Sequence, residues 1–269
     1  MSTNIEITPL RISTLVTTGH LGTTINLSKI FDEIKKHIIP IGYPDEGYLK
    51  MEYEDKVIGY SSRDLLTKRH VSDKTFFNQS TIVLRKIRND NGEFKEVNIK
   101  LFANGGFQMT GVINESFSRD VIEWVINTFN KFPSISESVP LELKKFTVQL
   151  LNSDYKINRN IKRAELHRII CSTYNLSSTL ETTIYQGVNT KYYYNENAVV
   201  KNGVCKCPKF CNGQGDGSDI GLCKRITIAI FQTGSIIITG ARTQRQLDEA
   251  YEFINTIIKK HLNEVTRSV

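Results

Sequence analysis

FQTGSIIITG, residues Phe231–Gly240, is the second copy of a motif whose first copy is FANGGFQMTG, residues Phe102–Gly111. Both copies read F-x-x-G-x-x-x-x-T-G. Each follows a segment in which apolar residues alternate with others, and each precedes a segment whose apolar residues have helical spacing. A motif that returns in the same context indicates an internal duplication.

The duplication continues through the segments that follow the motif. Their apolar residues keep a constant offset of 129 positions, which is also the offset between Phe102 and Phe231; the pairs are Ile122 with Tyr251, Val125 with Ile254 and Phe129 with Ile258. The proline- and serine-containing stretch 130–140 is typical of a linker. We therefore expect a first repeat over residues 1–130, a linker over 131–143 and a second repeat over 144–269, with a cysteine-rich insert at 196–223.

Each half is predicted to contain a strand, a helix capped at its start, several antiparallel strands and a long final helix. Asn26 is the expected cap of the first helix, and Cys171 is expected in a helix core. The predicted strands are 11–18, 47–57, 80–88, 94–102 and 107–110, then 146–151, 180–185, 190–194 and two strands within 224–239. Ile161 and Leu166 are assigned to one helical stripe. This order predicts an α+β fold in which helices cover one face of an antiparallel sheet.

The other face of such a sheet stays uncovered, and alternation decides which side chains it carries. Ile99 and Leu101 are predicted to face the helices, as are Ile228 and Ile230. The residues between and after them, Lys100, Phe102, Ala229 and Phe231, then point the other way. A phenylalanine that points outward in both copies suggests that this face binds something.

The composition narrows the classes of partner. The chain has 269 residues with a formal net charge of +7, which suits a polyanion such as nucleic acid. No apolar run is long enough to span a membrane, and the first residues lack an apolar signal core. Five cysteines then indicate a reducing, intracellular compartment.

The repeated motif and the segments around it resemble the TATA-box-binding protein family. Ile230–Ala241 is similar to the family's I-F-x-S-G-K-x-x-x-T-G-A segment, and the stretch from Leu247 to Lys260 is similar to its second long helix. His20-Leu-Gly22 followed by Ile25–Ile30 resembles N-L-G-x-x-L-D-L-x-x-I. The resemblance covers most of residues 10–262 and implies a pseudo-twofold, saddle-shaped sheet with helices on its convex face. The divergence and the Asn-, Ile- and Lys-rich composition suggest a large DNA virus as the source.

The resemblance also implies a set of DNA-binding residues. In the family, phenylalanines wedge between base steps in the minor groove and kink the duplex. Phe102 and Phe231 match one wedge position, Tyr185 matches a second, and the first-half counterpart of Tyr185 falls at Phe76 or Phe77. Thr110 and Thr239 match threonines directed at base edges, and Ile237 shares a face with Thr239.

The chain departs from the family at several of these positions. Thr14 and Leu150, with Gln149 adjacent, stand where the family has asparagines, and Lys100 and Gln108 replace apolar groove contacts. These changes predict weakened readout at the central step and a larger electrostatic share of binding. The expected phosphate contacts are Lys100, Arg85, Lys86, Arg88 and Arg242. Each assignment has a plainer alternative, because an isolated strand phenylalanine is more often core, threonines favour strands, and basic residues often line a solvated strand face.

The insert carries Cys205, Cys207, Cys211 and Cys223, spaced C-x-C-x3-C-x11-C. Three interpretations stay open: a structural zinc site, free thiols, or a disulfide. The usual C-x2-C knuckle is absent, and Gly213, Gly215 and Gly217 are typical of a mobile loop.

No catalytic motif accompanies these features. The five histidines show no paired metal spacing, and no nucleophile motif precedes a helix, so we expect a non-enzymatic protein that requires no cofactor. The function implied is a transcription initiation factor that binds and bends AT-rich promoter DNA and recruits factor-IIB-type proteins or RNA polymerase, in the nucleus or a viral cytoplasmic factory. The alternative is a protein-interaction adaptor of a transcription complex that has lost TATA-specific binding, with residues 196–223 as an added partner surface.

Overall fold

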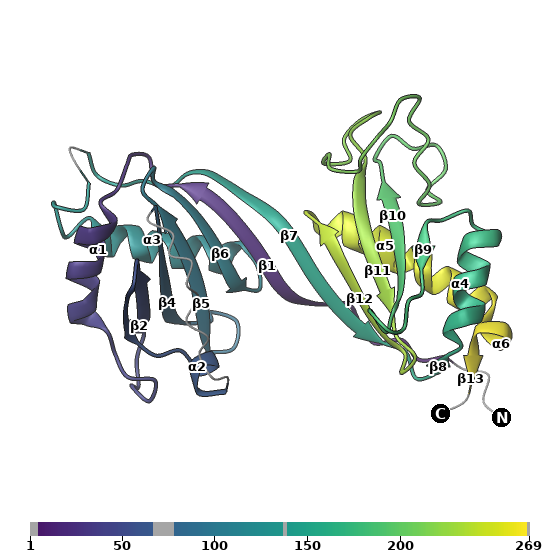
Figure 1. Cartoon of the computed structure of the whole chain (residues 1–269), viewed down its shortest axis with the longest axis horizontal. Helices are drawn as coiled ribbons and strands as arrows, with labels where there is room; N and C mark the ends of the chain where they lie inside the picture. Colours follow the sequence, from purple (N-terminus) through teal and green to yellow (C-terminus); the bar gives the residue numbers. More distant parts are fainter. Residues whose placement is uncertain (1–4, 67–77, 137–138, 268–269) are drawn as a thin grey trace. The chain divides into compact units, whose positions relative to one another are not determined.

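The computed structural model describes residues 5–66, 78–136 and 139–267, and the chain divides into two compact units. We call Thr14–Gln149 the N-terminal unit, and Met1–Ser13 with Leu150–Val269 the C-terminal unit. The chain passes from one unit to the other within two strands, β1 (Arg11–His20) and β7 (Lys144–Lys156) (Figure 1). The segment 131–143 lies in the N-terminal unit, where Ile135 and Leu141 are buried.

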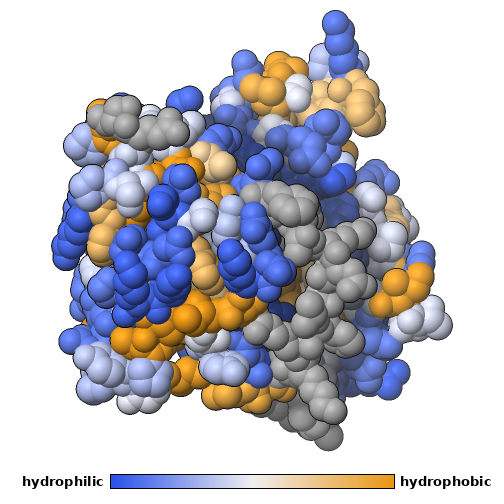
Figure 2. Space-filling view, turned by 60° about the vertical axis from the view of Figure 1, so that its left-hand side comes forward, coloured by the Kyte–Doolittle hydropathy of each residue, from blue (hydrophilic) through white to orange (hydrophobic). Residues whose placement is uncertain are grey.

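The N-terminal unit is an antiparallel sheet in the order β3-β2-β4-β5-β6-β1. Its further strands are β2 (Gly47–Tyr53), β3 (Lys56–Gly59), β4 (Gln79–Ile87), β5 (Phe94–Phe102) and β6 (Gly106–Val112). Its helices are α1 (Leu27–Ile34), the 3-10 turn η1 (Lys35–His37), α2 (Ser62–Leu66) and α3 (Glu115–Phe129). In the space-filling view that brings this unit forward, hydrophobic patches lie between hydrophilic side chains (Figure 2).

The C-terminal unit repeats this plan in the order β7-β12-β11-β10-β9. The strands are β9 (Ser178–Thr179), β10 (Val188–Tyr194), β11 (Lys224–Ile230) and β12 (Ser235–Ala241), and the helices are α4 (Arg163–Ser172), α5 (Gln244–Lys260) and α6 (Leu262–Val265). A separate two-stranded sheet joins β8 (Asn160–Ile161) to β13 (Thr266–Arg267). Both units therefore combine a meander of strands with a long helix after the last strand pair, which confirms the duplicated α+β fold.

The long helices begin at polar caps and bury one apolar stripe. The side chains of Asn114 and Thr243 accept the first free N–H groups of α3 and α5, and Asn26 does the same for α1. Helix α5 packs against β10, β11 and β12, and α3 packs against β6. The buried faces of both long helices hold the residues related by the repeat offset, which are Ile122, Val125 and Phe129 in α3 and Ile254 and Ile258 in α5.

The alternation on the central strands is also confirmed. Ile99, Leu101, Ile228 and Ile230 are fully buried, whereas Lys100, Phe102 and Phe231 keep part of their surface exposed. Ala229 differs, because it is only 3% exposed although it alternates with the buried isoleucines. Its small side chain stands between Asn189 and Ile237, its partners on the flanking strands.

Four local predictions were wrong. Residues 180–185 form a turn region rather than a strand, because the backbone N–H groups of Ile184 and Tyr185 donate back to Glu181. The predicted strand 47–57 is instead a hairpin of β2 and β3 that turns at Glu54, whose φ is 53°. Ile161 is buried, but it lies in β8 and not in helix α4. Cys171 does lie in α4, but it is half-buried and is not a core residue.

Among the described residues, no helix is long and apolar enough to cross a membrane.

Candidate nucleic-acid interface

The clearest grouping of predicted site residues in the C-terminal unit is an aromatic pair. Phe231 follows β11 directly and closes a tight turn into β12, with its N–H donating to Ser235 O at 2.9 Å. Tyr185 comes from the turn before β10. The two ring centroids lie 5.6 Å apart with an interplanar angle of 63°, an edge-to-face contact. Tyr185 remains 41% exposed, so the pair forms an apolar projection at the end of the sheet.

Gly187 explains how the two rings fit. A Cβ at this position would lie 3.0 Å from the Tyr185 ring and 3.3 Å from the Phe231 ring. The absence of a side chain therefore lets both rings rest against the backbone that leads into β10. This contact fixes where the aromatic pair stands relative to the strands.

In the N-terminal unit, Phe102 ends β5 and is half-buried. It lines a surface pocket together with Gly19, Asn78, Gly106 and the edge of Phe107. Its predicted partner, Phe77 or Phe76, lies outside the described residues. Phe102 thus occupies the position in its unit that Phe231 occupies in the other, at the end of the strand before the last hairpin.

The uncovered face of the C-terminal sheet carries two rows of side chains that run across the strands. One row contains Asn189, Ala229, Ile237 and Asp154, and the next contains Lys191, Thr227, Thr239 and Asn152. Ile237 is 36% exposed, which gives the first row an apolar centre. The second row is polar and joined by hydrogen bonds: Lys191 Nζ donates to Thr227 Oγ1 at 3.0 Å, and Thr239 Oγ1 donates to Asn152 Oδ1.

Asn152 is a site residue that the sequence reading missed. It lies two positions after Leu150 on β7, so the period of two along a strand puts it on the same face as Leu150. Its partner Thr239 belongs to β12, and only the register between the two strands brings them together. The uncovered face therefore carries an asparagine two residues along β7 from Leu150, the residue that matches one of the family's asparagine positions. Leu150 is half-buried.

The corresponding rows of the N-terminal unit are more polar. Thr81, Lys100, Gln108 and Thr18 are successive partners on β4, β5, β6 and β1, and Gln149 Nε2 donates to Thr18 Oγ1 at 2.9 Å. Thr110 stands opposite Asn98 in the next row. Lys100 and Gln108 thus hold the places of Ala229 and Ile237. Thr14 is half-buried in β1.

The predicted phosphate contacts divide into two groups. Arg85 is buried, and its guanidinium donates to the carbonyls of Ile41, Tyr43 and Asp45 while it stacks on Phe94. Lys86 pairs with Glu46, and Arg88 pairs with Asp90. These three side chains are accounted for by contacts within the N-terminal unit. Lys100 and Arg242 are half-buried, and the Nε of Arg242 is buried with no hydrogen-bond partner in the described part of the chain.

Cations gather around β10 and β11. Burial lowers the pKa of Lys191, and the neighbouring charge of Arg225 lowers it further. Burial also lowers the pKa of Lys224, to which the charges of Arg242 and Arg225 contribute. Arg225 therefore repels both lysines when all three side chains are protonated. Arg225, which is exposed, was not singled out from the sequence.

Three comparisons place this arrangement among known proteins. The model of the family described as "Transcription factor TFIID (or TATA-binding protein, TBP)" matches residues 222–261, which contain the Phe231 motif and most of α5. A protein of Acanthamoeba polyphaga mimivirus named "TATA-box-binding protein-like" is 26% identical over 276 residues, which cover 95% of this chain. A solved structure, Methanococcus jannaschii TBP, superposes with a TM-score of 0.52 over 94% of this chain and 99% of that one, at 12% identity.

The chain is thus TBP-like in sequence and in fold. The solved archaeal structure shows the shared fold, and the mimivirus protein supports the viral origin expected from the composition. This TBP-like chain spans 66% of the length of its mimivirus relative.

The TBP-like chain also holds its four insert cysteines together. The Sγ atoms of Cys205, Cys207, Cys211 and Cys223 all lie within 4.8 Å of one another. Cys223 Sγ is 3.8 Å from Cys205 Sγ and 3.4 Å from Cys207 Sγ, and all four thiols are free of disulfides. Burial raises the pKa of the Cys223 thiol to about 12, and the adjacent sulfurs of Cys207 and Cys205 raise it as well.

Proposed function

We propose that this TBP-like chain is a transcription initiation factor that binds AT-rich duplex DNA through the minor groove and bends it. The observation that carries the proposal is the contact between Tyr185 and Phe231, two aromatic side chains placed together at the end of an uncovered sheet face. Aromatic or aliphatic wedges of this kind unstack a base step, which costs a few kcal/mol. Contacts along the widened groove offset that cost.

The rows on the sheet supply matching chemistry for such a groove. The floor of the minor groove at A·T pairs presents only the acceptors A N3 and T O2. Donors on the uncovered face are the amide of Asn152 and the ammonium of Lys191, which stand in one row with Thr239. The exposed side chain of Ile237, at the centre of the other row, can face the sugar edges. TA-rich sequence is favoured further because pyrimidine–purine steps deform easily.

The cations at β10 and β11 support contacts to the phosphate backbone. Arg225 is exposed, and Lys191 lies on the same face two strands from Thr239. Phosphate contacts make affinity fall with salt but carry no sequence information. The N-terminal unit, with Lys100 and Gln108 in the equivalent row, would bind more by charge and less by apolar fit.

A binding and bending assay tests the proposal. Duplexes that are AT-rich or GC-substituted, labelled at both ends for energy transfer, would be titrated with the full chain and with Phe231→Ala and Tyr185→Ala. Each variant should weaken binding to the AT-rich duplex by about 5- to 150-fold, because stacking on a base contributes about 1–3 kcal/mol. Tyr60→Ala is the matched control, since Tyr60 is an aromatic residue 65% exposed in the other unit. Tight binding that neither variant changes, or binding without a bend, would refute the wedge mechanism.

A second candidate function is an adaptor in a transcription complex. The observation that favours it is the set of exposed apolar side chains in the insert: Val199, Val200, Phe210, Ile220 and Leu222. Val199, Val200 and Ile220 line one pocket, and contiguous exposed apolar surface marks an interaction site. RNA polymerase or a factor-IIB-type protein is the expected partner. If such a partner co-purifies with the chain while the labelled duplex shows no bend, the adaptor function holds and DNA bending does not.

A further inference from the structure

The insert between β10 and β11 is held by hydrogen bonds rather than by an apolar core, for example from the Tyr193 N–H to the carbonyl of Gly203 at 2.8 Å and from the Arg225 N–H to the carbonyl of Gly213 at 2.9 Å. Residues 196–223 form neither a helix nor a regular strand of the sheet, and their large apolar side chains are exposed rather than gathered into a core. A segment without a core generally needs a crosslink, either a disulfide or a metal ion, to become ordered. The four cysteines that converge within this segment are the groups able to supply one.

The spacing of the sulfurs fits a metal ion better than a disulfide. A tetrahedral zinc ion bound about 2.3 Å from each thiolate separates the sulfurs by about 3.8 Å. Cys223 Sγ lies 3.8 Å from Cys205 Sγ and 3.4 Å from Cys207 Sγ, and all four sulfurs lie within 4.8 Å of one another. A disulfide would bring two sulfurs to about 2.05 Å and leave the other two cysteines without a role.

Hydrogen-bond donors point at two of the four sulfurs. The backbone N–H of Gly221 donates to Cys207 Sγ at 3.1 Å, and the amide of Asn195 donates to Cys223 Sγ at 3.5 Å. Gly221 reaches this position with φ of +84°, a conformation that other residues rarely adopt. Such donors orient metal ligands and stabilise their negative charge. The exposed Lys206 and Lys209 stand between the ligands in the sequence and offset the negative charge of a four-thiolate centre.

We propose that Cys205, Cys207, Cys211 and Cys223 bind one structural zinc ion that clamps the insert to the start of β11. Cys223 immediately precedes Lys224, the first residue of β11, and the other three ligands come from the loop. The ion would therefore tie the loop to the strand whose far end carries Phe231. Because all four positions are protein thiolates, the site is closed and has a structural rather than a catalytic role.

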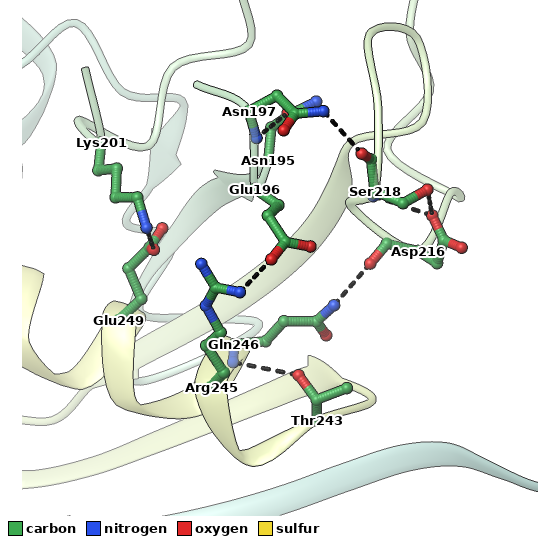
Figure 3. A network of polar contacts seen from close by, with 10 residues as sticks. All are labelled: Asn195, Glu196, Asn197, Lys201, Asp216, Ser218, Thr243, Arg245, Gln246 and Glu249. Atoms are coloured by element: carbon green, nitrogen blue, oxygen red, sulfur yellow. Dashed lines mark hydrogen bonds and ion pairs between the residues drawn. The ribbon is translucent and has the colours of Figure 1, made fainter. Parts of the chain in front are cut away.

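The clamp would also hold the insert on helix α5. Three contacts join the two: Glu196 with Arg245, Lys201 Nζ with Glu249 at 2.6 Å, and Gln246 Nε2 with the carbonyl of Asp216 at 2.6 Å (Figure 3). Within the insert, the amide of Asn197 donates to the carbonyl of Ser218 at 3.0 Å. Figure 3 shows these groups bridging the loop and the first turns of the helix. Polar contacts at a partly exposed surface are weak singly, so the metal would supply most of the order.

Metal analysis of the full chain, purified under reducing conditions without added metal, tests the proposal. One zinc ion per chain is expected, and replacement by Co²⁺ should give the intense visible and near-ultraviolet bands of a tetrahedral thiolate site. Cys207→Ser and Cys211→Ser should lose the ion. Cys171→Ser, which changes the one cysteine outside the cluster, should keep it. Metal-free protein with all its thiols reactive, or protein with disulfides among these cysteines, would overturn the assignment.

Limited proteolysis separates a clamp from an incidental ion. Lys201, Lys206 and Lys209 are exposed trypsin sites within the insert. Chelation of the metal, or Cys207→Ser, should speed cleavage at these lysines at least about tenfold, because the binding energy of the ion is also folding energy for the loop. Cleavage in the rest of the C-terminal unit should stay unchanged. Equal cleavage with and without the ion would show that the metal does not order the insert.

Discussion

Tyr185 and Phe231 meet edge to face, with 5.6 Å between their ring centroids, although one comes from a turn before β10 and the other from the end of β11. Each ring restricts the other, so the pair should enter a base step as a unit. We predict that Tyr185→Ala and Phe231→Ala are not additive: the double variant should bind AT-rich duplex about as weakly as Phe231→Ala alone. Fluorescence anisotropy on the four proteins of the cycle measures this coupling. Fully additive losses would mean that the two rings act separately.

Lys100 holds the place in the N-terminal unit that Ala229 holds in the C-terminal unit. Its charge should act on the phosphates, and Lys100→Ala should lower the slope of log K against log salt by about 1, uniformly for all duplexes. Titrations at several salt concentrations measure the slope. Lys259→Ala removes an exposed charge from the last turn of α5 and should leave the slope unchanged. A loss that appears only with AT-rich duplex would instead assign Lys100 to base readout.

The hydrogen bond between Thr239 and Asn152 gives a separate prediction about selectivity. Thr239→Val keeps the shape of the side chain and removes the hydroxyl. It should reduce the preference for AT-rich over GC-substituted duplex, by about 1–3 kcal/mol if the hydroxyl contacts a base edge. Competition binding measures the preference. Thr233→Val, in the turn after Phe231, is the control. If the preference is unchanged and the protein is less stable, the role of Thr239 is to join β12 to β7 and not to contact a base.

Asp64 provides a pH-dependent element of stability in the N-terminal unit. Burial raises the pKa of its carboxyl, but hydrogen bonds from Lys50 Nζ and from the N–H and hydroxyl of Ser61, each 2.8 Å long, lower it to about 2. The ordinary value is 3.8, so the stabilisation is fully present above about pH 4 and is lost as the pH falls towards 2.

Asp64→Asn should therefore destabilise the N-terminal unit by about 1–3 kcal/mol at pH 7, and the difference from the unaltered chain should shrink between pH 4 and pH 3. Urea unfolding followed by the fluorescence of Trp124, the single tryptophan, reports on this unit. Asp55→Asn, in the exposed turn between β2 and β3, serves as the control. A difference of the same size at pH 7 and pH 3 would contradict the role of the charge.

The sequence was most informative where the structure depends on local period. The alternation around Phe102 and Phe231, the cap at Asn26 and the stripes of the long helices follow from neighbouring residues, and the structure has them as expected. The duplication adds a second, independent copy of each signal. These features predicted the α+β fold and which side chains leave the sheet on its uncovered face.

Contacts between distant segments could not be predicted in this way. Arg85 reads as a surface cation by charge, but three carbonyls from the loop 41–45 surround its guanidinium. Asn152 becomes part of the face only through the register of β7 and β12. The residues around Tyr185 favour a strand, but the backbone N–H of Tyr185 donates to the carbonyl of Glu181 and closes a turn. In each case the deciding partner is far away in the sequence or competes with a weak local preference.

The insert occupies the connection between β10 and β11, and the matching connection between β4 and β5 is the short turn at residues 88–93. A duplicated binder whose two faces were alike could occupy a duplex groove in either direction, because such a groove is almost unchanged by reversal. Here the two faces already differ through Lys100 and Gln108, and the insert adds a second difference between the repeats. A factor that docks on the insert would contact one repeat alone, so its position would report the direction in which the protein is bound.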